Sequence, residues 1–184
     1  MSRVLTIVTS NANKAQEVAA FFGGTLTVRH VALDIPELRS EEVSEIAREK
    51  ARYAYDHLQE PLIVDDTAFS IDSLKGFPGP YAAYVLRSIG NTGILKLMEG
   101  VTDRNARFTT AIAFADETGI EIFTGIIDGR IITAPRGTGG FGYDPIFEVG
   151  GQTLAEIPLE KKSAISHRAR ALAAFRDWFV RRQA

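Results

Sequence analysis

The chain has 184 residues, of which 45% are hydrophobic and 24% are charged, so it is long enough for one compact domain with a substantial core. Its formal charge of -2 removes the electrostatic argument for a dedicated binder of nucleic acid or anionic membranes. The absence of cysteine excludes disulfides, thiolate nucleophiles and cysteine-bearing zinc sites. The first residues lack a signal-peptide pattern and no apolar run approaches the ~18 residues of a membrane span, so we expect a cytoplasmic protein.

The first half of the chain predicts alternating strands and helices. Residues 4–9 form a β-rich run, and residues 14–22 have helical character. A second helix is predicted over residues 40–59, with Ser40 as its N-cap. Residues 62–64 predict a short buried strand that presents two adjacent aspartates at its carboxyl end.

The second half predicts an antiparallel meander followed by a helix. Residues 107–115 and 120–127 have the composition of strands, and Asp128-Gly129 is a strong hairpin signal. Ser166 can cap a C-terminal helix whose apolar residues face the core. The mixture of crossover and hairpin connections indicates an α/β fold with a mixed β-sheet.

The loop between the first strand and the first helix has the composition of a phosphate site. Lys14 falls in the first turn of its helix, where the positive end of the backbone dipole disfavours a cation unless an anion binds nearby. The free N–H groups of such a turn suit phosphate oxygens. A solvated lysine is the alternative for this segment alone. The predicted cradle comprises Thr9, Ser10, Asn11, Ala12, Asn13 and Lys14.

Lys50 is the more informative lysine, because it lies three or four residues from Ile46, Ala47 and Ala54 on the apolar stripe of the second helix. A cation at this position faces inward. Either its stem extends along the edge of the core to water, or its ammonium meets a buried carboxylate or a ligand phosphate. We favour the second interpretation.

Asp65 and Asp66 are adjacent, and successive side chains of an extended chain point to opposite faces, so only one is expected to bind a given ion directly. Two close carboxylates raise each other's pKa unless a cation offsets the repulsion. Magnesium, held by one or two carboxylates and substrate phosphates, fits this pattern. A turn-forming aspartate pair is the alternative. Glu37 follows a proline in a loop and is a candidate second ligand.

Residues 137–142 satisfy the G-x-G-x-x-G pattern of dinucleotide-binding proteins, which makes an oxidoreductase an alternative. That fingerprint must open a helix, whereas Pro145 and an extended run over residues 146–149 follow here. We therefore predict a loop whose glycines let the backbone approach a ligand and which presents Phe141 and Asp144 to it. The sequence lacks G-x-x-x-x-G-K-[ST], which excludes a P-loop mechanism.

Three donors lie near the start of the predicted C-terminal helix. His167 and Arg168 follow the predicted cap Ser166, and Lys162 lies a few residues earlier. Donors at this place suit acceptor oxygens of a ligand. For the pair alone, a solvated helix terminus is the favoured alternative.

Together, and in this order, these segments resemble the inosine triphosphate pyrophosphatase family, whose members are also described as XTP/dITP diphosphatases. The resemblance runs nearly end to end. Any one of the segments is weak, but four in register are highly specific. They are residues 9–14, residues 64–67 followed by 76–81, residues 139–147, and residues 166–168.

The resemblance implies an elongated fold with a long mixed sheet, a single domain of two lobes around a deep cleft, and a homodimer. It implies hydrolysis of ITP, dITP and XTP to monophosphate and pyrophosphate with Mg2+, which cleanses the nucleotide pool. Glu37 and Asp66 match the metal ligands, and Asp66 also matches the residue that activates water. Asp65 could share either role. The implied substrate contacts are Lys14 and Lys50 for the triphosphate, and Thr67, Phe141, Gly142, Tyr143, Asp144, Lys162, His167 and Arg168.

Matching of hydrogen-bond donors and acceptors supports this base preference. Hypoxanthine and xanthine present an O6 acceptor that matches donors on His167 and Arg168, whereas adenine presents an amine. Leaving buried donors unpaired costs ~1–3 kcal/mol each. Guanine shares O6, so its rejection needs another cause. The alternatives are a pyrophosphatase for other modified nucleotides, and a nucleotide-binding module without turnover, which the presence of Glu37, Asp65 and Asp66 disfavours.

Overall fold

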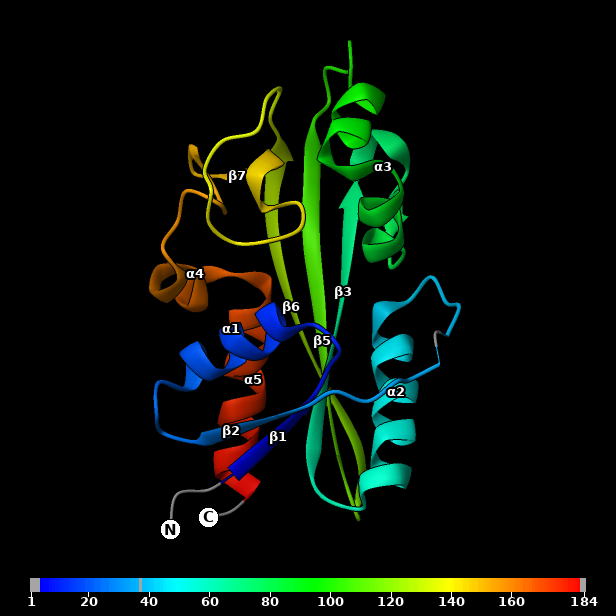
Figure 1. Cartoon of the computed structure of the whole chain (residues 1–184), viewed down its shortest axis with the longest axis vertical. Coiled ribbons are helices and arrows are strands. Elements are labelled where there is room, and N and C mark those ends of the chain that lie inside the picture. The colour runs from blue at the N-terminus through cyan, green and yellow to red at the C-terminus, as the bar shows by residue number, and fades with distance from the viewer. Residues whose placement is uncertain (1–3, 37, 183–184) are drawn as a thin grey trace.

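The computed structural model describes residues 4–36 and 38–182, and it shows an elongated molecule built around one mixed β-sheet (Figure 1). The strands are β1 (Val4–Val8), β2 (Thr27–Val31), β3 (Leu62–Ile71), β4 (Pro78–Gly79), β5 (Asn105–Asp116), β6 (Gly119–Ile131), β7 (Phe147–Val149) and β8 (Gln152–Thr153). The helices are α1 (Ala12–Phe22), α2 (Val43–Leu58), α3 (Ala82–Leu97), α4 (Leu159–Ile165) and α5 (His167–Arg182). Two short 3-10 turns are η1 (Asp72–Leu74) and η2 (Asp144–Ile146).

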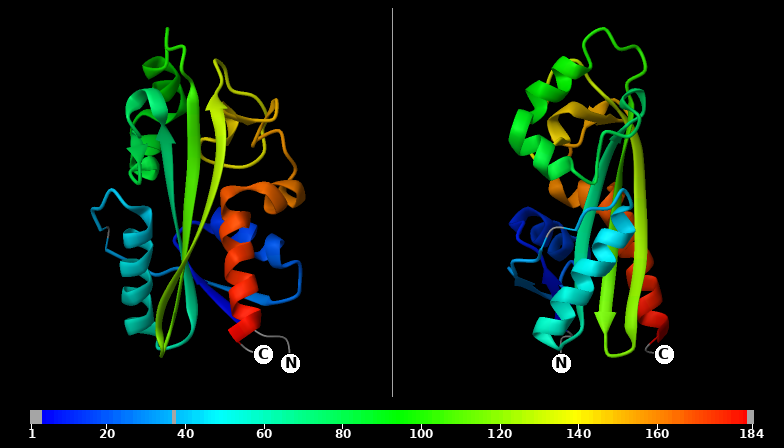
Figure 2. Two further views of the ribbon diagram at one scale, coloured as in Figure 1. Left: turned by 180° about the vertical axis from the view of Figure 1, so that it is seen from behind. Right: turned by 90° about the vertical axis from the view of Figure 1, so that its right-hand side faces the viewer.

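The strand order β2-β1-β3-β5-β6-β7-β8 joins a parallel part to an antiparallel part, with β4 paired to β3. The β1 strand pairs in parallel with both β2 and β3. The long β5–β6 hairpin runs along the molecule and pairs antiparallel with β3 on one side and with β7 on the other (Figures 1 and 2). The α/β class and the mixed sheet predicted from the sequence are therefore confirmed. No helix in the described ranges is long and apolar enough to cross a membrane.

The α2 helix and the α1/α5 pair cover opposite faces of the sheet, and β3 supplies residues to both (Figure 2). Side chains of even number on β3, such as Leu62 and Val64, pack with buried alanines of α2. Ile63, of odd number, packs with α1 and α5, while Phe69 and Ile71 further along belong to a separate cluster beside α3. The alternation of an extended strand thus sends successive side chains into different environments.

Between these two apolar clusters, the odd-numbered face of β3 carries Asp65 and Thr67. The predicted strand at residues 62–64 is therefore too short, since β3 continues to Ile71 and the aspartate pair lies in its middle. The error has a physical cause. Aspartates are depleted in strands, and only their ionic partners from other elements make this position stable.

Two predictions made from short sequence signals, a hairpin turn and a helix cap, differ from the structure. The predicted hairpin at Asp128-Gly129 is wrong, because β6 passes through both residues. A Cβ on Gly129 would lie 2.4 Å from the carbonyl oxygen of Glu148 and 2.6 Å from the Phe147 ring, so this glycine admits the close approach of β7. Ser40 is not the N-cap of α2, but its hydroxyl accepts a hydrogen bond from the Glu42 backbone just before the helix.

No element is predicted from the amino-acid sequence for the residues of α3 and α4. The α3 helix is interrupted at Gly90, where φ is 63° and ψ is -175°, and such a break weakens the helical pattern in the sequence. The α4 helix has seven residues, too few for a clear period. At the C-terminal helix, Ser166 does cap as predicted, since its hydroxyl accepts from the backbone N–H of Ala169.

The close packing of α5 against the sheet depends on Gly125 of β6. A Cβ at this position would lie 2.1 Å from the His167 carbonyl oxygen and 2.5 Å from the Ala171 nitrogen. We expect Gly125→Ala to lower the free energy of unfolding by about 1–3 kcal/mol, because backbone of α5 must move. Urea denaturation measures this change. Thr124→Ala, at the neighbouring exposed position, is the control and should change stability far less; equal effects of both substitutions would contradict the packing argument.

Candidate active site

A cleft of about 720 Å³ opens at the edge of β3. The β1 strand pairs with residues 62–64 of β3 and β4 pairs with residues 69–70, so the edge between them has no strand partner in the described part of the chain. Side chains from both faces of the sheet reach this gap. Representative lining residues are Asn11, Lys14, Lys50, Asp66, Leu86 and Phe141.

The loop that follows β1 forms one end of the cleft. Asn11 is the N-cap of α1, and its side chain accepts a hydrogen bond from the Asn13 backbone at 3.0 Å. The Asn11 backbone donates to the Thr9 hydroxyl at 3.1 Å, which tightens the loop. The first turn of α1 contains no acidic residue, so its free N–H groups and its positive dipole end are available to an anion.

Lys14 extends from this first turn toward β3. Its ammonium lies 2.7 Å from Oδ1 of Asp65 and donates to the Asp65 carbonyl oxygen at 3.1 Å. The carboxylate compensates for a cation at the positive end of the helix dipole, and the bond to the carbonyl satisfies part of the open edge of β3. The ammonium remains partly exposed and lines the cleft.

Asp65 and Asp66 point to opposite faces, as predicted, and their environments differ. The side chain of Asp65 is fully buried, whereas that of Asp66 is 13% exposed and lines the cleft. Asp66 forms an ion pair with Lys50 of α2 at 3.0 Å. This contact confirms the prediction that Lys50 faces inward to meet a carboxylate.

The two aspartates also differ in pKa. Burial would raise the pKa of Asp65, but the charges of Arg168 and Lys14 hold that pKa well below its usual range. Burial raises the pKa of Asp66 above its ordinary value, because Lys14 and Lys50 offset only part of the desolvation. Asp65 is therefore committed to its ionic partners, and Asp66 is the better proton acceptor.

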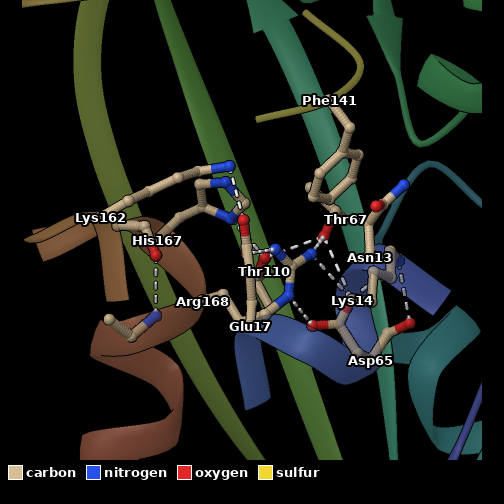
Figure 3. Close-up of polar contacts among 12 residues, drawn as sticks. Asn13, Lys14, Glu17, Asp65, Thr67, Thr110, Phe141, Lys162, His167 and Arg168 are labelled. Atoms are coloured by element: carbon tan, nitrogen blue, oxygen red, sulfur yellow. Dashed lines mark hydrogen bonds and ion pairs between the residues drawn. The ribbon is translucent and has the colours of Figure 1, made fainter. Parts of the chain in front are cut away.

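A buried ion network lies behind the cleft, with Arg168 at its centre (Figure 3). Nε of Arg168 lies 2.5 Å from Asp65 Oδ2, and its NH1 group binds Glu17 of α1. Glu17 also accepts from Lys162 at 2.5 Å, and Lys162 lies 2.6 Å from Asp144. Four elements (α1, β3, α4 and α5) and the turn η2 therefore meet through charge-assisted hydrogen bonds in a nearly dry environment.

Phe141 lies against this network as a flat aromatic surface on the cleft. The Lys162 ammonium is 4.8 Å and the Arg168 guanidinium carbon 5.9 Å from the centre of its ring. Its backbone N–H donates to Asp144 at 2.8 Å. A Cβ on Gly140 would lie 2.1 Å from the same Asp144 oxygen, so the turn requires glycine there. Phe141 and Asp144 of this loop both line the cleft, with the Asp144 carboxylate held by Lys162.

Tyr143 and Gly142 have more structural roles. The Tyr143 ring stacks on Phe69 at 4.5 Å, and its hydroxyl donates to the Ala82 carbonyl oxygen at 2.7 Å. Burial raises the pKa of Tyr143 to about 12. The Gly142 carbonyl oxygen accepts from Asn91 at 3.0 Å, which ties the loop to α3. Both residues border the cleft while anchoring its wall.

His167 is buried rather than solvated at the start of α5. Its ring stacks on Phe108 at 4.7 Å between centres, and its Nδ1 lies 2.5 Å from the Thr110 hydroxyl. Burial, followed by the charge of Arg168, lowers the pKa of His167 well below 6.5. The imidazole is therefore neutral at physiological pH and acts through its hydrogen bonds.

The amino-acid sequence matches the Ham1 family over residues 5–178. The chain belongs to the Ham1 family. It is 46% identical over 170 residues to the dITP/XTP pyrophosphatase of Methanopyrus kandleri, which covers 91% of this chain and 89% of that protein. It is 45% identical over 179 residues to inosine triphosphate pyrophosphatase 1 of Trypanosoma cruzi, which covers 95% and 91%. A solved structure of a HAM1 protein from Coxiella burnetii matches with a TM-score of 0.83 at 29% identity, covering 98% of this chain and 100% of that chain.

Most of the site residues predicted for this Ham1-family chain come together around one cleft. Glu37 lies outside the described residues, and Ser10 in the loop after β1 and Ala12 and Asn13 at the start of α1 are exposed. Glu17 was missed. At i+3 from Lys14 on a helix, it has the pattern of a surface ion pair, and only the packing of α5 and α4 against α1 shows that it is buried.

Neutral His167 makes the stability of the fold depend on pH. Its pKa is lower in the folded state than in the unfolded state, so the unfolded chain gains the proton first as pH falls below 6.5. Stability is therefore lost with falling pH, by up to about 1.4 kcal/mol per pH unit. Urea unfolding from about pH 7 to about pH 5 should show this slope in the wild type and a smaller one in His167→Asn. His57→Asn on the exposed face of α2 should retain it, and equal slopes in wild type and His167→Asn would refute the assignment.

Proposed function

We propose that this Ham1-family chain hydrolyses 6-oxo purine nucleoside triphosphates, namely ITP, dITP and XTP, to monophosphate and pyrophosphate. One observation carries the proposal: a single cleft joins a lysine-rich phosphate end to an aromatic surface with hydrogen-bonding groups. Lys14, Lys50 and Asp66 lie at the first, and Phe141 and Arg168 at the second. The similarity to a dITP/XTP pyrophosphatase of Methanopyrus kandleri and to an inosine triphosphate pyrophosphatase of Trypanosoma cruzi supports this assignment.

The phosphate end provides positive charge where a triphosphate needs it. Lys14 and Lys50 approach from opposite faces of β3, and the N-terminus of α1 adds oriented N–H groups. Phosphoryl transfer depends mainly on positioning and electrostatic stabilisation. Both lysines already contact a carboxylate, which holds their ammonium groups at the cleft before substrate binds.

Asp66 is the residue we assign to water activation. It is partly exposed in the cleft, its pKa is raised, and Lys50 fixes its orientation. Asp66 accepts a proton as the water oxygen bonds to phosphorus, and the bridging oxygen leaves with the pyrophosphate. Asp65 keeps Arg168 and Lys14 in place instead.

Magnesium is the cofactor that we propose for this site, with Asp66 and Glu37 as the ligands. The described residues contain no group of three or more His, Asp or Glu side chains that could hold a metal. Magnesium is commonly held by one or two protein carboxylates, and water and substrate phosphates complete its shell. When bound, the ion supplies neutralisation of charge on the phosphate oxygens.

The homodimer and the cytoplasmic location are further parts of the proposal. Large apolar side chains are exposed near β4 and along the first half of α3, where Phe77, Tyr81 and Tyr84 are 42%, 47% and 64% exposed. A cluster of this kind fits a contact between two copies of the chain.

The products identify the reaction. With ITP and magnesium we expect pyrophosphate as the first product, and a chelator should abolish its release. ATP should be cleaved at least tenfold more slowly, since sites that read a polar group reject mismatched bases strongly (about 1–3 kcal/mol per unpaired group). Ion chromatography of the products from ITP, XTP, ATP and GTP measures both quantities. Orthophosphate as the first product, or equal rates on ITP and ATP, would refute the proposal.

The role of Asp66 as proton acceptor can be tested with a substitution that removes the charge of the side chain and keeps its shape. We expect Asp66→Asn to lower kcat by about a hundredfold or more, because an amide cannot accept the proton, while ITP still binds. Stopped-flow turnover and calorimetric binding measure the two effects separately. Asp128→Asn, at a position whose side chain is 74% exposed on β6, is the control. Turnover that survives in Asp66→Asn would remove Asp66 from this role.

A further inference from the structure

Four side chains form a continuous relay from the buried carboxylate of Asp65 to the ring of His167 (Figure 3). The Thr67 hydroxyl lies 3.3 Å from Asp65 Oδ1 and 2.9 Å from the Thr110 hydroxyl. The Thr110 hydroxyl lies 2.5 Å from Nδ1 of His167. Thr110 is fully buried, so water does not compete for these bonds.

The direction of the hydrogen bonds follows from the end at Asp65. Asp65 is buried between the cations of Lys14 and Arg168, at 2.7 Å and 2.5 Å, and an ionised carboxylate only accepts hydrogen bonds. The Thr67 oxygen already accepts from NH2 of Arg168 at 3.2 Å, so its hydrogen points toward the Asp65 carboxylate. The Thr67 oxygen then accepts from Thr110, and the Thr110 oxygen accepts from His167. Each hydroxyl donates once, and no donor faces another donor.

This order places the hydrogen of neutral His167 on Nδ1 and leaves a lone pair on Nε2. The ring cannot rotate freely, because it stacks on Phe108 and is almost completely buried, yet the residue borders the cleft. His167 therefore has an acceptor to offer to a ligand. The donors at this end of the cleft are Lys162 and Arg168.

We propose that Thr67 and Thr110 are positioning residues that fix the Nδ1–H tautomer of His167, so that Nε2 accepts a hydrogen bond from N1–H of a 6-oxo purine. The inference rests on the proposed function and refines it. Hypoxanthine and xanthine carry a hydrogen on N1, whereas adenine has a lone pair there and would set acceptor against acceptor. The acceptor role replaces the donor role that the sequence hypothesis gave to His167. Guanine also carries N1–H, so the relay discriminates against adenine alone.

The tautomer can be observed directly in the complete chain without nucleotide. Long-range 1H–15N correlation spectra of protein labelled with 15N-histidine distinguish the protonated from the unprotonated ring nitrogen. We expect His167 to carry its hydrogen on Nδ1 in the wild type and to shift toward Nε2–H in Thr110→Val. A wild-type ring with its hydrogen on Nε2 would overturn the inference, whatever the substrates of the enzyme.

Kinetics then test the consequence for selectivity. In Thr110→Val, an Nε2–H group can donate to N1 of adenine, so kcat/KM for ATP relative to ITP should rise by about ten- to a hundredfold. The ratio for GTP to ITP should stay constant, since both bases carry N1–H. Thr110→Ser should restore the wild-type ratio. Thr6→Val, which removes a buried hydroxyl of β1 that donates to Glu60 between α2 and β3, is the matched control and should change neither ratio.

Each remaining outcome decides the question. An unchanged ratio of ATP to ITP in Thr110→Val overturns the relay, and so does an equal rise for ATP and GTP, which indicates a loosened pocket. If Thr110→Val does not fold, Thr67→Val interrupts the same relay one bond earlier and should shift the tautomer and the ATP ratio in the same direction. Failure of the wild type to release pyrophosphate from ITP would refute the proposed function and leave the tautomer measurement standing.

Discussion

The buried guanidinium of Arg168 is the constraint on which the site depends. A charge that is 2% exposed costs several kcal/mol of desolvation unless carboxylates surround it. Glu17 on α1 and Asp65 on β3 meet this requirement, so one side chain joins the start of the C-terminal helix to the first helix and to the central strand. Removing one partner from such a buried network costs about 3–5 kcal/mol, which exceeds the contribution of most single apolar contacts. The ion pairs of Arg168, together with apolar packing, therefore fix the positions of the two ends of the cleft relative to each other.

The alternation of β3 then separates two kinds of chemistry across one strand. Asp65 and Thr67 face α1 and α5, where they complete the ion network and the hydroxyl relay. Asp66, between them in sequence, faces α2 and meets Lys50 in the cleft. The open edge of the strand, where β1 has stopped pairing and β4 has not begun, lets one cleft reach both faces. An adjacent pair of aspartates can thus divide into one structural and one reactive carboxylate, with pKa values displaced in opposite directions.

Features that depend on residues close together in the sequence were predicted correctly. The period of α2 placed Lys50 among buried alanines, the extended geometry separated Asp65 from Asp66, and the proline after the glycine loop excluded a dinucleotide fold. Features caused by tertiary approach were missed or misread. Gly129 has the sequence signature of a turn but serves the close approach of β7, and Glu17 resembles a surface residue until α4 and α5 pack against it. The buried state of His167 likewise depends on Gly125 from a strand more than forty residues earlier, which no local pattern records.

The charges of the site are divided in a way that suits the two ends of a nucleotide. In the described residues, the buried network balances three cations, Lys14, Lys162 and Arg168, against three carboxylates, Glu17, Asp65 and Asp144. Among the residues that the structure describes, the other charged side chains that line the cleft are Arg39, Lys50 and Arg87 against Asp66, which gives an excess of positive charge. A nucleobase is neutral, so a balanced network neither attracts nor repels it by charge, and selection there must depend on the direction of hydrogen bonds. A triphosphate is strongly anionic, so the unbalanced cations favour it whatever base it carries. Affinity therefore originates at the phosphate end of the cleft and selectivity at the base end. Selectivity requires that His167 be neutral.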